Sequence, residues 1–191
     1  CVRIAYHHTD IVYMSKDQEV LRDVEHEVKE EATQGIVCTN RNKMSLQGLL
    51  EYANTIDLAE IKDVIQRQIE MNSRISQEGL DNAWGAQIGK TILGNWGHDV
   101  RTEACAAAAA GSDARMSGCP LPVVINSGSG NQGITVTMPV LVYAREWKIS
   151  EEKMYRALLV SNLVSIYIKH YIGALFAFCG AVSAACGSGA A

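Results

Sequence analysis

The chain has 191 residues, of which 48% are apolar and 20% are charged, and its formal net charge is -4. These values are typical of one folded domain that buries a sizeable core. Because acidic residues outnumber basic ones and no basic stretch stands out, the composition excludes nucleic acid as an expected partner.

Both ends of the chain are unusual for natural termini. It begins at Cys1 without a signal or transit peptide, and it ends at Ala191 within an apolar, small-residue segment. Natural termini are usually polar. We therefore expect an internal stretch of a longer cytoplasmic protein, with residues 1–191 forming a single domain. Within it, residues 1–43 are expected to be a β-containing entry segment and residues 44–191 a helical core.

The first quarter of the chain holds the expected strands. Two short β-type runs, Val2 to Tyr6 and Ile11 to Met14, predict a hairpin or two neighbouring strands. The charged and polar stretch from Lys16 to Gln34 predicts a surface helix.

From Ser45 onward the hydrophobic pattern is helical. Asp57 and Glu60 have the spacing of a capping box. Apolar residues then recur at helical intervals, namely Ile61, Val64, Ile65, Ile69 and Ile75. Further helices are expected over residues 82–95, after a cap at Asp99, from Ser150 to His170, and from Gly173. The predicted fold class is mostly α (α+β), a helical core with a small β element near the N-terminus.

The uncharged stretch from Tyr171 to Ala191 is long enough to span a bilayer. Its residues are mainly Ala, Gly, Ser and Cys, which suit a helix buried against other helices or a cofactor. We therefore expect no membrane as a partner. The six cysteines form no CxxC pair, so reduced thiols, each packed in the interior unless other signals intervene, are expected.

Most of the loop chemistry is expected between Gly111 and Gly133. The segment Asn126-Ser127-Gly128-Ser129-Gly130-Asn131-Gln132-Gly133 has three glycines within its last six residues, which lets the backbone adopt positive φ and approach a ligand closely. Its amide groups can form an anion-binding nest, aided by a helix that begins near its end. The segment matches neither the dinucleotide fingerprint nor the P-loop. Apolar runs on both sides, which are expected to bury the ends of the loop, favour a carboxylate-binding loop over a flexible surface loop.

Two charged residues precede this loop. Asp113 and Arg115 are compatible with a structural ion pair at a helix end, or with Arg115 holding a substrate carboxylate by a bidentate contact. The pair His7 and His8 lies near a turn, where histidines are more often solvated than catalytic.

Three groups of residues together carry a family resemblance. They are Ala110-Gly111-Ser112-Asp113-Ala114-Arg115-Met116, the glycine-rich loop, and Phe178-Cys179-Gly180 with the trailing Gly187-Ser188-Gly189-Ala190. The chain resembles the iron–sulfur L-serine dehydratase alpha-chain superfamily, most closely its L-cysteine desulfidase branch, also labelled an uncharacterised serine-dehydratase-like family. His8-Thr9 also resembles that branch.

The resemblance implies a lyase of amino-acid catabolism that uses a 4Fe-4S cluster and no pyridoxal phosphate. An open iron would bind the amino acid and act as a Lewis acid in β-elimination. L-cysteine would give pyruvate, ammonia and sulfide, and L-serine would give pyruvate and ammonia.

By the same resemblance, Cys179 is the first cluster ligand and His8 the candidate catalytic residue. Cys186 has the spacing of the family's second ligand pair, but its neighbours differ, so we expect it to be a packing residue. The other ligands and a candidate base are expected outside this chain.

The substrate-binding residues expected for either function are Asn126, Ser127, Gly128, Ser129, Gly130, Asn131, Gln132 and Arg115. The alternative function is a non-catalytic small-molecule binding or regulatory homologue that lacks the cluster. The expected partner is a small amino acid, and a homo-oligomer is compatible with the sequence.

Overall fold

A computed structural model describes residues 1–4, 11–24, 40–172 and 180 of the chain. The chain divides into two compact units. One comprises residues 1–44 and 170–177, and the other comprises residues 45–169 and 178–191. The helical unit contains the glycine-rich loop.

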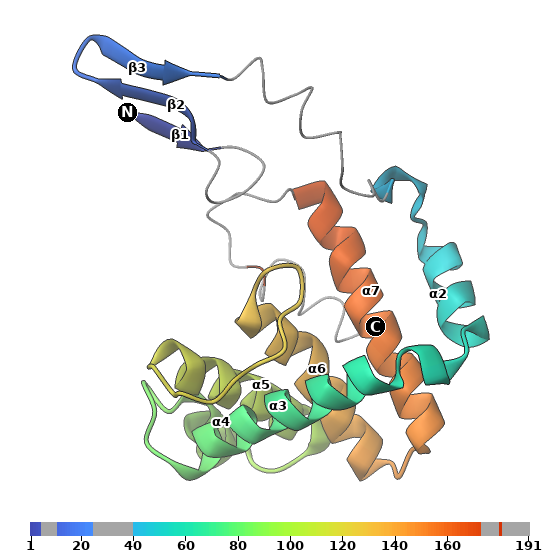
Figure 1. Cartoon of the computed structure of the whole chain (residues 1–191). Coiled ribbons are helices and arrows are strands. Elements are labelled where there is room, and N and C mark those ends of the chain that lie inside the picture. The colour runs from blue at the N-terminus through green and yellow to red at the C-terminus, as the bar shows by residue number, and fades with distance from the viewer. Residues whose placement is uncertain (5–10, 25–39, 173–179, 181–191) are drawn as a thin grey trace. The chain divides into compact units, whose positions relative to one another are not determined.

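The first unit contains a three-stranded antiparallel sheet in the order β1-β2-β3 (Figure 1). Its strands are β1 (Val2–Ile4), β2 (Ile11–Lys16) and β3 (Glu19–Asp23). The prediction of neighbouring strands at the start is confirmed. The prediction of a surface helix from Lys16 is wrong for residues 19–23, which form β3. There, Asp17 adopts a positive φ of 53° in a tight turn, which lets Glu19 pair with Lys16.

The second unit contains most of the helical structure, which confirms the predicted fold class. Its elements are α2 (Leu46–Thr55), η2 (Leu58–Glu60), α3 (Lys62–Asp81), α4 (Ile88–Trp96), α5 (Val100–Met116), α6 (Gly130–Glu146) and α7 (Glu151–Ile172), whose last residues belong to the first unit. A 3-10 turn, η1 (Arg41–Lys43), precedes them in the first unit.

Helix α5 packs against α3, α4 and α6 (Figure 1). Its buried face consists largely of alanines, and glycines allow close crossings of the helices. A Cβ on Gly79 of α3 would collide with the carbonyl group of Ala110, and one on Gly111 would lie 3.0 Å from Ile134 Cγ2. Small residues therefore bring α3, α5 and α6 close together, as their abundance in the sequence predicts.

The apolar face of α3 differs in part from its predicted pattern. Ile65 and Ile75 are buried, whereas Val64 is 64% exposed. Polar side chains share the buried face with the two isoleucines, at Gln68 and Asn72. The helical period is thus correct, but the buried face is more polar than the isoleucines alone suggest.

Asp99 caps α5 as predicted, because its carboxylate accepts hydrogen bonds from the N–H groups of Thr102 and Arg101. The bond from Thr102 is the main cause that lowers the pKa of Asp99 below its ordinary value. Helix α5 continues to Met116, so the loop expected from Gly111 begins only after that residue.

Two other helix starts differ from the expected ones. Asp57 caps the short η2 turn, and α3 begins at Lys62. The helix expected over residues 82–95 is formed only from Ile88. Asp113 of α5 accepts hydrogen bonds from the N–H groups of Ala86 and Ile88, so a tertiary contact sets the start of α4.

Helix α7 confirms the long helix expected after Ser150. The helix expected from Gly173 lies outside the described residues. Within the part of the chain that the structure describes, no helix is long and apolar enough to cross a membrane.

Candidate functional site

The glycine-rich loop begins with a tight turn. The N–H group of Asn126 donates to the carbonyl oxygen of Ser129 at 3.1 Å, and the reverse bond measures 3.0 Å. Between them, Ser127 and Gly128 have φ values of +47° and +84°. Positive φ at both central residues is typical of a type I′ turn. The turn supports the prediction that the glycines permit unusual backbone geometry here.

Helix α6 begins directly after this turn. The hydroxyl group of Ser129 accepts a hydrogen bond from the N–H group of Gln132 and so caps the helix. A Cβ on Gly130 would collide with the guanidinium group of Arg115, and one on Gly133 would collide with the carbonyl oxygen of Val124. Glycine at these two positions therefore lets α6 start against the segment that leads into the loop, with the positive end of its dipole at the loop.

A network of uncharged polar side chains lies beneath the loop. Gln132 is fully buried, and its Nε2 donates to Asn126 Oδ1 and to Ser165 Oγ, at 2.9 Å each. Asn126 Nδ2 in turn donates to Asn162 Oδ1 at 2.9 Å. Asn162 Nδ2 donates to Gln68 Oε1 at 3.0 Å. The network thus joins the loop to α3 and α7.

Asn72 ties the same network to the segment before the loop. Its side chain accepts a hydrogen bond from the N–H group of Val124 at 2.9 Å and donates to the carbonyl oxygen of Val124 at 3.2 Å. It also donates to Thr137 Oγ1, which accepts a second bond from Gln68 Nε2. Asn72 and Thr137 are completely buried. Buried side chains therefore hold the segment that leads into the loop, and Asn126 and Gly130 of the loop are themselves buried.

Among the described residues, two buried polar atoms of the loop have no hydrogen-bond partner, Ser127 Oγ and Gln132 Oε1. Both amide hydrogens of Gln132 are used within the network, so its oxygen stays available as an acceptor. A buried acceptor without a partner costs about 1–3 kcal/mol. A hydrogen-bond donor of a bound molecule would satisfy such an atom.

Arg115 lies beside the start of α6. Its Nη1 donates to Asn131 Oδ1 at 3.0 Å. The alternative of an ion pair with Asp113 is wrong, because the carboxylate of Asp113 is directed to the N–H groups at the start of α4. Arg115 is therefore placed at the loop, as the second alternative requires.

Gly180 lies against the network from the C-terminal part of the chain. A Cβ on this residue would collide with Gln132 Oε1 and would lie 3.6 Å from Lys169 Nζ. Glycine at position 180 therefore permits the close approach of the backbone to the Gln132 oxygen. Cys179 is the covalent neighbour of this glycine.

Three predicted residues, His8, Cys179 and Cys186, lie outside the described residues. Among the described cysteines, Cys1 and Cys105 are exposed, and Cys119 is buried in the apolar core. The described ranges contain no group of three His, Cys, Asp or Glu side chains that could hold a metal ion.

Sequence reasoning missed the residues that support the loop from α3 and α7. Gln68 and Asn72 lie four residues apart, so the helical period places them on one face of α3. Polar residues at that interval on the same side of a helix as buried isoleucines were the available signal. Asn162 was visible as a polar interruption of α7, but its partners were not.

A cavity of about 360 Å³ lies between α3, α5, the C-terminal half of α6 and the start of α7. No residue of the glycine-rich loop lines it. A concave pocket at the loop itself stays a prediction.

Comparison with known proteins places this arrangement in a family. The family model described as "Serine dehydratase alpha chain" matches residues 15–191. The chain is 45% identical to a UPF0597 protein of Desulfitobacterium hafniense over 99% of its own length and 43% of the relative's. It is 46% identical to a UPF0597 protein of Lachnoclostridium phytofermentans, over 99% of this chain and 44% of that protein. A UPF0597 protein of Finegoldia magna is 48% identical, with the same coverage of 99% and 44%.

The chain thus spans less than half the length of these curated relatives. No solved structure gives a significant match. The family match covers the glycine-rich loop, the helices beneath it and the segment around Cys179. The chain therefore belongs to the serine dehydratase alpha chain family.

Proposed function

We propose that the full-length protein is an iron–sulfur-dependent lyase that catalyses β-elimination of a small amino acid, L-cysteine or L-serine. With L-cysteine and water the products are pyruvate, ammonia and sulfide. L-serine gives pyruvate and ammonia, because the water lost in the elimination is regained when the imine product hydrolyses. Membership of the serine dehydratase alpha chain family supports a lyase of this general class.

The single observation that carries the proposal is the loop on its buried amide network. A free amino acid presents a carboxylate and an ammonium group a short distance apart. The N-terminus of α6 and the Arg115 guanidinium favour the carboxylate. Gln132 Oε1 is an acceptor for the ammonium group, which can only donate hydrogen bonds. Holding both groups would orient the Cα–Cβ bond for elimination.

Cys179 is the residue of this chain that would ligate the cluster. Cys179 directly precedes Gly180 in the sequence, and Gly180 lies against Gln132. When bound, a cluster with one open iron would supply a Lewis acid for the departing β-substituent. The chain's own residues bind and orient the amino acid, and His8 stays the candidate for moving the α-proton.

The binding role of Arg115 is tested in the full-length enzyme. Arg115→Gln should raise the KM for the amino acid about tenfold, since a charge-assisted hydrogen bond to the carboxylate is worth about 1.5–3 kcal/mol. Arg101→Gln, an exposed arginine on the same helix, is the matched control and should leave KM unchanged. Steady-state kinetics measure both, and the melting temperature shows that the variants remain folded. An unchanged KM in a folded Arg115→Gln variant contradicts the role.

The metal role of Cys179 is tested by anaerobic reconstitution of the full-length protein with iron and sulfide. Cys179→Ser should abolish both the cluster absorbance and the elimination activity, whereas Cys186→Ser should keep most of each. A Cys179→Ser variant with normal absorbance would exclude Cys179 as a ligand. A wild-type protein that binds amino acids but incorporates no cluster would support the non-catalytic alternative.

A further inference from the structure

A second concave site lies apart from the glycine-rich loop. The cavity of about 360 Å³ is lined from α3, α5, the C-terminal half of α6 and the residues that follow, up to Met154 at the start of α7. Its volume falls near the lower end of the range of roughly 300–1,000 Å³ that ligand pockets occupy. The cavity therefore has the size for a small molecule.

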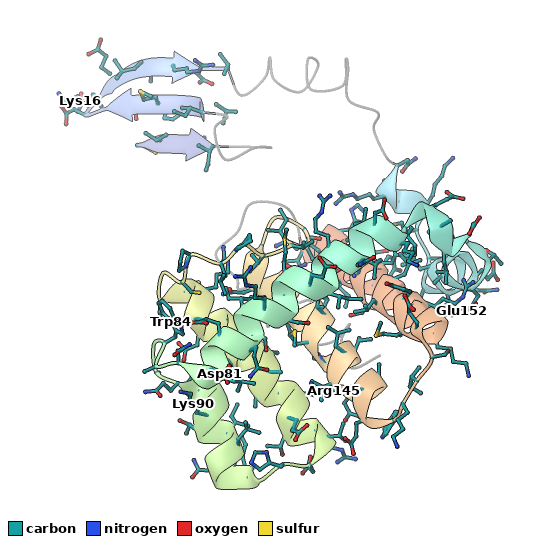
Figure 2. All side chains as sticks on the ribbon, turned by 60° about the horizontal axis from the view of Figure 1, so that its bottom comes forward. Lys16, Asp81, Trp84, Lys90, Arg145 and Glu152 are labelled. Carbon is teal, nitrogen blue, oxygen red and sulfur yellow. The ribbon has the colours of Figure 1, made fainter. Side chains whose placement is uncertain are left out.

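The lining combines apolar walls with one cationic group. Met138, Ile149 and Met154 contribute apolar side chains, and Ser73 contributes a small polar one. Arg145, labelled in Figure 2, is exposed at the same cavity. Within the described ranges, its guanidinium group has no ion pair or hydrogen bond. An apolar cavity beside an unpaired arginine is complementary to a carboxylate that carries an apolar tail.

The cavity shares helices with the amide network but none of its residues. Ser73 directly follows Asn72, and Met138 directly follows Thr137, so the two sites use adjacent residues of α3 and α6. Arg115 and the loop residues are absent from the cavity lining. A ligand in the cavity therefore leaves the loop free.

We propose that this cavity is a binding site for a small monocarboxylate with an apolar tail, which Arg145 pairs with at the carboxylate while the methionines and Ile149 contact the tail. This site is separate from the proposed reaction site and does not depend on the elimination chemistry.

The test uses the full-length protein and isothermal titration calorimetry with octanoate as the probe. Octanoate should bind with one site per chain, and the uncharged octanamide should bind about tenfold more weakly, because it lacks the charge that pairs with arginine. Arg145→Gln should remove this preference by weakening octanoate about tenfold while leaving octanamide unchanged. Arg74→Gln, an exposed arginine of α3 outside the cavity lining, is the matched control and should bind octanoate like the wild type.

A second variant tests the cavity without changing its charge. Ser73→Phe should fill the cavity and abolish binding of both probes, and its melting temperature shows whether it is folded. Three outcomes would overturn the proposal. They are no octanoate binding to the wild-type full-length protein, unchanged binding in Arg145→Gln and folded Ser73→Phe, or competition between octanoate and L-serine, which would place the probe at the loop.

Discussion

Gln132 joins the glycine-rich loop to the helices beneath it. Its side chain is fully buried and donates to Asn126 in the loop and to Ser165 on α7. Burying an amide is favourable only when its hydrogen bonds are made. The two donated bonds therefore orient the side chain, and its oxygen has no hydrogen-bond partner among the described residues.

Replacing Gln132 should destabilise the protein strongly. Gln132→Ala leaves Asn126 Oδ1 and Ser165 Oγ without their donor, and an unsatisfied buried polar group costs about 1–3 kcal/mol. Urea unfolding of the full-length protein measures the loss. Gln66→Ala is the control, because Gln66 is exposed and its side chain donates to Glu70 on its own helix, so its effect should stay within about 0.5 kcal/mol. Equal effects of the two variants would contradict a structural role for the network.

At the level of elements, the start of α6 depends on a close backbone approach. Gly133 faces the carbonyl oxygen of Val124, which belongs to the segment that Asn72 holds. A backbone atom cannot move aside as a flexible side chain can. The position of α6 relative to the loop therefore depends on the absence of a Cβ at Gly133.

Two glycine substitutions in helices should have opposite effects. Gly133→Ala should destabilise the protein by about 1–3 kcal/mol through overpacking against Val124. Gly94→Ala in α4 should stabilise it by about 0.5–1 kcal/mol, because nothing lies within 4 Å of the added Cβ and alanine favours the helix. Thermal unfolding compares the two variants. A stabilised Gly133→Ala would show that α6 can shift at little cost.

At the scale of the whole molecule, contacts between distant residues hold the helical unit together. Arg156 of α7 donates to the carbonyl oxygen of Ala53 at 2.8 Å, across 103 residues of sequence. It also donates to the carbonyl oxygen of Ile56 at 3.4 Å. These carbonyl groups lie at the C-terminal end of α2, where a positive charge is favourable. Ala53 and Ile56 also pack against Leu159 in a small apolar cluster.

Removing this contact should loosen α2 selectively. Arg156→Gln should lower the protection of the α2 amides by about 1–2 kcal/mol, since hydrogen bonds from a charged donor are lost, while α5 keeps its protection. Hydrogen exchange read out by mass spectrometry measures both helices. Lys153→Gln, an exposed residue of α7, should leave the exchange of α2 unchanged. Uniformly faster exchange in every helix of Arg156→Gln would point instead to global destabilisation.

The sequence by itself determined the features that short windows encode. Short β-type runs predicted the first two strands, Asp99 predicted the start of α5, and the acidic residues after Ser150 predicted the start of α7. The three glycines of the segment from Asn126 to Gly133 predicted unusual backbone geometry, which is confirmed at Gly128, whereas Gly130 and Gly133 lie in the first turn of α6. Capping, periodicity and turn chemistry act between residues a few positions apart, so they can be read from one stretch of chain.

Only the tertiary structure decided which polar residues meet. Strand β3 formed where the local composition favoured a helix, because pairing with β2 outweighed it. Asp113 caps α4 from 25 residues away, and Asn162 meets Gln68 across 94 residues. Such partners depend on how α3, α5, α6 and α7 cross. The small residues that permit those crossings do not indicate which side chains of two helices will contact each other. The loop was therefore visible in the sequence, while the amide network that supports it arose only from helix packing.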